Sequence, residues 1–87
     1  MTVTDKFKWI EWNIEHIALK GITPEETESV FHNPARGYPR RHRKGYLIKG
    51  KSILDRWIQV AFAREPDNRI FVFHARPLTP KERKALK

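Results

Sequence analysis

The sequence predicts an α+β domain in which N-terminal helices pack on a small, mainly antiparallel sheet and a short C-terminal helix follows. Residues 23–26 and 79–82 both read Thr-Pro-x-Glu, a capping hydroxyl, then Pro at the first helical position, then Glu three residues after the cap. Residues 57–64 and 70–76 are rich in β-branched and aromatic residues around a Glu-Pro-Asp-Asn turn. Helices and strands are segregated along the chain, and 87 residues suit a single domain spanning 1–87.

The first expected elements are a strand and a short helix. Residues 7–12 alternate aromatic and polar side chains, which is typical of a strand. Asn13 is expected to cap a helix that runs to Lys20, and Gly21 fits the position just after a helix end. The predicted apolar stripe of this helix consists of Ile14, Ile17 and Ala18.

A second helix is expected from Pro24 to about Phe31 or His32. Its first turn is acidic, which suits the helix dipole. Val30 and Phe31 are expected to face the core, and the Asn-Pro pair at 33–34 should end the helix.

The second half of the chain is expected to form a sheet. The predicted elements are an irregular basic segment at 35–45, a strand at 46–49, a turn at 50–52, a strand at 57–64, a turn at 65–68, a strand at 70–76 and a helix from Pro80. A hairpin that pairs Arg64 with Arg69, or slips by two, gives two distinct faces. The expected apolar face holds Ile58, Val60, Phe62, Phe71, Phe73 and Ala75. The expected second face holds Trp57, Gln59, Ala61, Ala63, Ile70, Val72, His74 and Arg76.

Composition narrows the functional classes. The absence of cysteine excludes disulfides, thiolate chemistry and Cys-based zinc sites. The four histidines lack the spacing of a metal motif, so neither a metal nor a cofactor is expected. No apolar run resembles a signal peptide or a membrane span, which predicts a cytoplasmic protein with no membrane partner.

The charge is unevenly distributed. Residues 1–35 hold three Lys/Arg and six Asp/Glu, a net of −3, whereas residues 36–87 hold fifteen and four, a net of +11. This asymmetry favours a polyanionic partner over a merely solubilising surface charge.

The second sheet face holds the main site candidates. Small side chains at Ala61 and Ala63 would leave room for a ligand, and Trp57 could stack a base. His74 could act as general acid or base, and Arg76 could hold a phosphate. The alternatives are that the C-terminal helix covers this face, leaving His74 as a packing residue, and that Arg76 only forms an ion pair with Glu82.

Other basic groups are candidate RNA contacts. His16 and Lys20 are four residues apart and share a helix side, as an RNA-contacting pair or as plain exposed residues. The run 40–44, flanked by Tyr38 and Tyr46, is either a solvated loop or a loop that follows phosphates. We favour the second reading for the run. Its expected contacts are Arg40, Arg41, Arg43, Lys44 and Tyr46.

Several segments together resemble one protein family. These are Phe7-Lys8-Trp9, residues 13–16, residues 20–23, Glu25-Glu26, Val30-Phe31 and the closing run from His74 to Arg83. Across nearly the whole chain the sequence is similar to the BrnT-type toxins of the RelE-like superfamily. The most specific part is a strand ending in Ala-Arg, followed by Thr-x-x-Glu-Arg at the start of a helix.

The resemblance implies a RelE-like fold and a toxin of a type II toxin–antitoxin system, an endoribonuclease that cuts RNA and inhibits translation. It also implies a cognate ribbon-helix-helix antitoxin, through which the complex would bind DNA. Two departures from the family pattern affect the activity. Leu19-Lys20-Gly21 stands where the family commonly has Lys-His-Gly, and Lys84 stands where an aromatic commonly follows Glu-Arg. They motivate an alternative, a non-catalytic RNA- or DNA-binding module on the same scaffold.

RNA can be cut without a metal when a base takes the 2′-OH proton, an acid protonates the leaving 5′-oxygen and cations stabilise the phosphorane. Arg76 is the expected phosphate clamp and His74 the expected acid or base. His16 is a further catalytic candidate. Glu82 is first a capping residue, with catalysis as its second role, and Arg83 beside it is an expected RNA contact.

Overall fold

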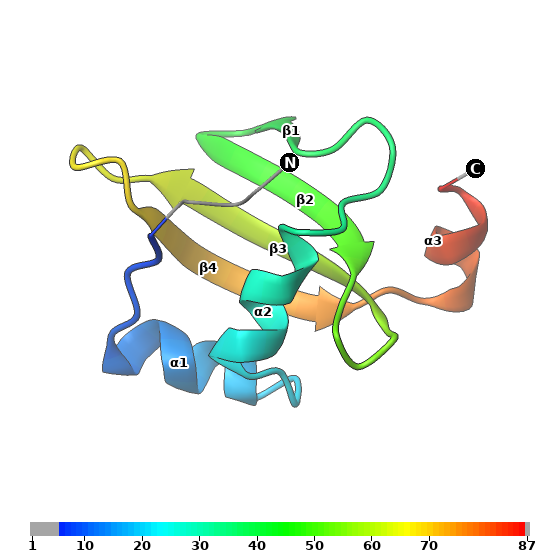
Figure 1. The fold of residues 1–87 in the computed structure, drawn as a ribbon, viewed down its shortest axis with the longest axis horizontal. Coiled ribbons are helices and arrows are strands. Elements are labelled where there is room, and N and C mark those ends of the chain that lie inside the picture. Colours follow the sequence, from blue (N-terminus) through cyan, green and yellow to red (C-terminus); the bar gives the residue numbers. More distant parts are fainter. Residues whose placement is uncertain (1–5, 87) are drawn as a thin grey trace.

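The computed structural model describes residues 6–86 and contains a four-stranded antiparallel sheet with three helices in this part of the chain (Figure 1). The strand order is β1-β2-β3-β4. The elements, in chain order, are α1 (Glu11–Ala18), α2 (Pro24–Val30), β1 (Arg40–His42), β2 (Gly45–Lys51), β3 (Trp57–Arg64), β4 (Ile70–Pro77) and α3 (Pro80–Lys84). The expected α+β class is therefore confirmed, together with its N-terminal helices, antiparallel sheet and short C-terminal helix.

Helix α1 begins earlier than the sequence analysis predicts. The expected strand over residues 7–12 is wrong: Phe7 forms only an isolated bridge with Ile70, and the helix already starts at Glu11. Asn13 is not the N-cap but the third helical residue. Its side chain accepts a hydrogen bond from the Ile10 N–H at 2.8 Å and donates to the Lys8 carbonyl at 2.9 Å. Asn13 thus caps the helix from inside, because its amide reaches back to backbone groups that have no helical partner.

The buried side of α1 also differs from the expected stripe. Ile17 is fully buried, but Ile14 and Ala18 are exposed, and the second buried position is Asn13. Gly21 ends the helix as expected. Its φ is +73°, its N–H donates to the Ala18 carbonyl, and the Ile22 N–H donates to the Ile17 carbonyl. These two bonds form a Schellman motif, for which glycine is the favoured residue.

Helix α2 is capped by Thr23, whose hydroxyl accepts the Glu26 N–H at 3.1 Å. Val30 and Phe31 are buried as expected. The expected turn at 50–52 is wrong in part, because Gly50 lies within β2. A Cβ at Gly50 would lie 2.6 Å from the Asn33 carbonyl oxygen and 2.9 Å from that of Val30, so glycine here lets the end of α2 approach the strand.

A β-bulge at Phe73 corrects the predicted faces of the β3–β4 hairpin. Arg64 pairs with Ile70 and Phe62 with Val72, but beyond the irregularity Ala61 pairs with His74 and Val60 with Ala75. One extra residue in β4 shifts the alternation by one. Ile70 and Val72, expected on the second face, are therefore core residues. Phe71 and Phe73 are expected in the core, but Phe71 is half-buried and Phe73 is exposed.

One face of the sheet carries the core and the N-terminal helices. Helix α2 packs against β2 and β3, and α1 lies along β4, an edge strand (Figure 1). The buried apolar residues on this side are Ile17, Ile22, Val30, Phe31, Ile48, Ile58, Val60, Phe62, Ile70, Val72 and Ala75. Within residues 6–86, no helix combines the length and the apolar character needed to cross a bilayer.

Candidate functional site

The second face of the sheet has no helix packed over it in the described part of the chain, and we call it the open face. Its members are the residues that the strand pairing places on the same side of the sheet as His74 and Ala61. All of them are half-buried. They are Leu47, Lys49, Lys51, Trp57, Gln59, Ala61, Ala63, Phe71, His74 and Arg76. Helix α3, which could have covered His74, instead lies beyond the end of β4 (Figure 1).

His74 meets α1 at the β4 edge of the open face. The His16 and His74 rings have centroids 6.1 Å apart, at 64° to one another. Trp12 stacks on His16 at 4.9 Å and on Phe71 at 6.0 Å, both nearly parallel. Two histidines expected to act on RNA therefore lie side by side, and an aromatic residue holds one of them in place.

The surroundings of His74 favour its neutral form. Burial lowers the pKa of His74 below its ordinary value of 6.5, and the positive charges of His16, Arg76 and Lys20 lower it further. A neutral imidazole at physiological pH can accept a proton, so the site suits His74 to the role of general base.

Arg76 is held by Glu82 in a two-bond ion pair. The Arg76 Nη1 lies 2.8 Å from Glu82 Oε1, and its Nη2 lies 2.6 Å from Oε2. Glu82 also accepts the Thr79 N–H, which completes the capping box of α3. The hydrogen bonds from Arg76 lower the pKa of Glu82 to about 2. Glu82 is therefore ionised at neutral pH and has no proton to donate. Its two bonds to Arg76 suit it instead to positioning that side chain.

The hairpin of β1 and β2, with the turn at residues 43–44, forms the opposite edge of the sheet, and we call it the basic hairpin. Strand β1 places Arg40 opposite Leu47, which is opposite Ala61, which in turn is opposite His74. Three strand spacings separate the ends of this row, a distance of about 14 Å. The Arg40 guanidinium lies 4.1 Å from the Tyr38 ring centroid, and that of Arg41 lies 5.4 Å from the Tyr46 ring centroid. Predicted phosphate contacts and predicted catalytic groups thus lie at the two ends of one row.

Arg43 occupies the turn between β1 and β2 with φ of +57°. This left-handed conformation costs a non-glycine residue roughly 1 kcal/mol. We expect Arg43→Gly to raise the free energy of unfolding in urea by about 0.5–1 kcal/mol while weakening RNA binding. Asn68→Gly, at φ +70° in the β3–β4 turn, is the matched control, expected to stabilise without changing binding. An unchanged affinity for Arg43→Gly would contradict a role of this turn in RNA contact.

The remaining predicted contacts are spread out. Trp57 and Arg83 line one hollow of about 370 Å³ with Pro80 and Lys84, between the open face and α3. Lys20 is exposed just beyond α1 and affects the electrostatics of His74. Arg83 belongs to α3, which lies beyond the end of β4 (Figure 1).

Sequence reasoning missed the aromatic residues beside the histidines. Trp12 is half exposed and Phe73 is 42% exposed, and neither was predicted as a contact. The spacing of Trp12 and His16, four residues apart in a helix, is a signal that could have found the first pair. No sequence signal marks Phe73, because its exposure depends on the bulge.

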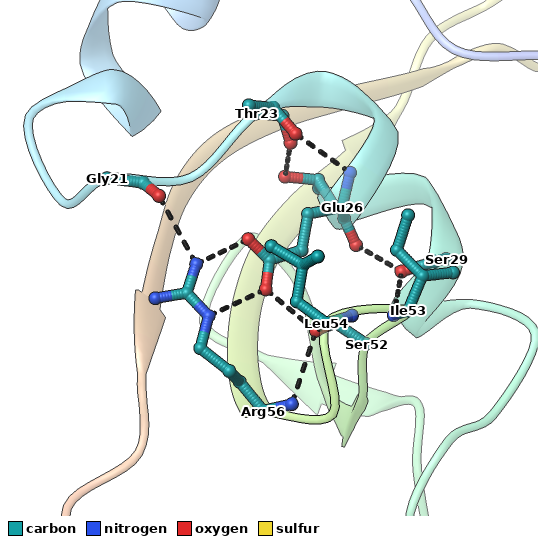
Figure 2. Close-up of polar contacts among 9 residues, drawn as sticks. Gly21, Thr23, Glu26, Ser29, Ser52, Ile53, Leu54 and Arg56 are labelled. Carbon is teal, nitrogen blue, oxygen red and sulfur yellow. Dashed lines mark hydrogen bonds and ion pairs between the residues drawn. The ribbon is translucent and has the colours of Figure 1, made fainter.

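A buried polar network was also missed, and it fixes the loop after β2 to α2 (Figure 2). The Glu26 carboxylate is 1% exposed and receives hydrogen bonds from Arg56 Nε at 2.9 Å and Ser52 Oγ at 2.7 Å. Arg56 also donates to the Gly21 carbonyl at 3.2 Å. Glu26 therefore does not reach back to cap α2, as its place in the Thr-Pro-x-Glu pattern suggests, because Arg56 engages its carboxylate.

Comparisons of the chain with family models, with curated proteins and with solved structures gave no significant match. Within residues 6–86, no group of three or more His, Asp or Glu residues is arranged to hold a metal ion.

Proposed function

We propose that this chain is a metal-independent endoribonuclease, the toxin component of a type II toxin–antitoxin system of the BrnT type, with a RelE-like fold. The observation that carries the proposal is the pairing of His16 with His74 at the edge of an open, cation-flanked sheet face. The charge of residues 36–87, +11, supplies attraction for RNA along the same face.

The arrangement supports a different chemical role for each of the two histidines. His74, neutral because of its lowered pKa, takes the proton of a ribose 2′-OH. The 2′-oxygen then attacks the adjacent phosphorus, the bond to the 5′-oxygen breaks, and His16 supplies a proton to that oxygen. The products are a 2′,3′-cyclic phosphate and a 5′-OH. An in-line displacement puts the two oxygens on opposite sides of phosphorus, so base and acid must be neighbours without touching each other.

The cations have separate roles in this scheme. Arg76, oriented by Glu82, is positioned to bind the scissile phosphate, and Lys20 adds positive charge near His74. Such groups stabilise charge that develops on the phosphorane. The hairpin residues Arg40 to Lys44 would hold phosphates further along the strand, which contributes affinity but no base recognition.

The test is cleavage of an end-labelled RNA by the purified protein in EDTA, resolved on a denaturing gel. We expect fragments ending in a cyclic phosphate, which Arg76→Ala should abolish. Arg69→Ala, which removes an exposed arginine paired with Asp67 in the β3–β4 turn, is the matched control and should cut normally.

RNA that stays intact both free and in a translating extract would overturn the nuclease proposal. It would favour the non-catalytic RNA-binding module, which the bidentate engagement of Arg76 by Glu82 supports independently. Cutting only in the translating extract would indicate a ribosome-dependent enzyme.

The proposed partners follow from the proposed class. A cognate ribbon-helix-helix antitoxin in the cytoplasm would neutralise the chain, and DNA would be bound only through that antitoxin. Expression of the chain alone is expected to arrest host growth, and Arg76→Ala is expected to relieve the arrest.

A further inference from the structure

A small hollow lies between the turn of the basic hairpin and the bulge in β4. Its volume is about 180 Å³, and its lining includes residues 42–44, Gly45, Ala61 and Phe73. This is smaller than the roughly 300–1,000 Å³ of pockets that hold drug-sized ligands. The space suits one planar ring system.

The lining combines apolar surface with basic side chains. Ala61 and Phe73 present apolar surface, and the Phe73 ring is held edge-on by Phe71 with centroids 5.4 Å apart. Arg43 and Lys44, both exposed, supply two positive charges, and no acidic residue in the described part of the chain lines the hollow. The matching ligand is a flat, largely apolar ring attached to an anion.

The hollow is adjacent to His74 along the sheet. Ala61 is the cross-strand partner of His74, and Phe73 directly precedes it in the chain. The bulge that exposes Phe73 thus places an aromatic face one residue from the proposed general base. Bulges commonly redirect a side chain beside an active site in this way.

We propose that this hollow binds one unpaired nucleobase of a single-stranded RNA, stacked on Phe73, next to the scissile phosphate. The inference rests on the proposed function and specifies its substrate. Arg43 and Lys44 bind the flanking phosphate while the base enters over Ala61. Since the apolar lining offers few hydrogen-bond partners, the hollow selects unpaired bases but discriminates weakly among them.

The exclusion of duplex RNA follows from geometry. A base can enter the hollow only when it leaves its stack, which costs a few kcal/mol in a duplex and much less in a single strand. A-form duplex would therefore bind only through its phosphates.

The experiment measures binding without chemistry. The probe is a fluorescein-labelled 2′-O-methyl RNA single strand, which lacks the 2′-OH proton and cannot be cut, and its anisotropy is followed at several salt concentrations. Phe73→Ala should weaken binding by roughly tenfold or more, as for loss of a base-stacking aromatic, and Phe73→Tyr should restore it. The salt slope should stay unchanged, since no phosphate contact is lost.

A substitution that fills the hollow provides an independent test of the base subsite. Ala61→Leu should weaken binding to a similar extent, whereas Ala18→Leu, at an exposed position of α1 outside the lining, should not. Each variant is checked for an unchanged unfolding midpoint. The duplex form of the probe should bind wild type and Phe73→Ala equally.

The outcomes separate this inference from the nuclease proposal. Normal cleavage of RNA with binding that is insensitive to Phe73→Ala and Ala61→Leu would overturn the base subsite and leave the nuclease. Loss of binding in both variants without any cleavage in wild type would support the subsite and overturn the nuclease. A loss of duplex binding in Phe73→Ala as large as the loss for the single strand would also overturn the subsite.

Discussion

Replacement of His74 by alanine is expected to lower the rate of RNA cleavage by roughly 10²- to 10⁴-fold, the range for loss of a general base. The ring of His74 lies beside His16 on the open face, and no other imidazole described here faces it. Binding of uncleavable RNA should change little, because Arg76 and the hairpin still hold the phosphates. Single-turnover cleavage beside anisotropy measures the two quantities separately.

The pH profile provides a sharper readout of the same residue. Because the pKa of His74 is lowered, its neutral form persists as the pH falls below 6.5. The acidic limb of kcat/KM for wild type should therefore lie below pH 6.5, and the residual activity of His74→Ala should lack that limb. A profile unchanged by the substitution would contradict the assignment of His74 as the base. His32→Ala, an exposed histidine after α2, is the matched control.

The stability of the fold should also fall as the pH is lowered and His74 becomes protonated. The folded pKa lies below the unfolded one, so the unfolded chain binds more protons when the pH is between them. The contribution of neutral His74 is fully present above pH 6.5 and is lost as the pH falls through the folded value.

Arg56→Ala is expected to lower the free energy of unfolding by about 3 kcal/mol, because it leaves the buried Glu26 carboxylate without its cation. This is the low end of the range for broken buried pairs, since the Arg56 side chain is 37% exposed. At roughly 4–8 °C per kcal/mol for a domain of this size, the melting temperature should fall by more than 10 °C. Urea and thermal unfolding measure both quantities.

The two partners should not be equivalent. Glu26→Ala leaves Arg56 free to turn toward solvent, so it should cost less than Arg56→Ala. The double variant, Glu26→Ala with Arg56→Ala, should recover part of the loss, and together with the two single variants it gives the coupling energy. Arg69→Ala, in an exposed pair, should cost under about 1 kcal/mol. Equal losses for Arg56→Ala and Arg69→Ala would show that burial of Glu26 contributes little.

Acid should weaken the same network. Burial alone would raise the pKa of Glu26, but hydrogen bonds from Arg56 and Ser52, with the Arg56 charge, lower it below 4.5. Its stabilising contribution is therefore present above pH 4.5 and is lost as the pH falls through the lowered value. The difference in stability between wild type and Arg56→Ala should accordingly narrow in acid.

Local sequence signals predicted the elements that depend on local chemistry. Thr23 and Thr79 cap their helices because a hydroxyl followed by proline satisfies free backbone N–H groups. The β3 and β4 strands follow β-propensity and a strong turn at 65–68. The start of α1 was missed because Asn13 is read as an N-cap by type, whereas tertiary contacts of its amide place it inside the helix.

The site residues were predicted correctly only where side chains alternate regularly between the two faces of the sheet. His74, Arg76 and Ala61 lie on the predicted face because the register beyond the bulge matches the expectation. Phe71 and Phe73 changed sides because a single inserted residue in β4 has no local signature. Glu26 and Arg56, thirty residues apart, meet only through the fold, and composition gives no indication of which of several carboxylates finds a buried cation.

Strand β1 has a consequence for the free protein. An edge strand offers unpaired backbone groups to which a second chain can add, and proteins protect such edges with short strands and charged side chains. β1 is three residues long, and its exposed sequence is Arg-Arg-His. The arginines that we propose to hold RNA therefore also keep this edge from joining another sheet. Substitutions that neutralise them should therefore lower both the affinity for nucleic acid and the resistance to aggregation. Binding measured at low protein concentration separates the two effects.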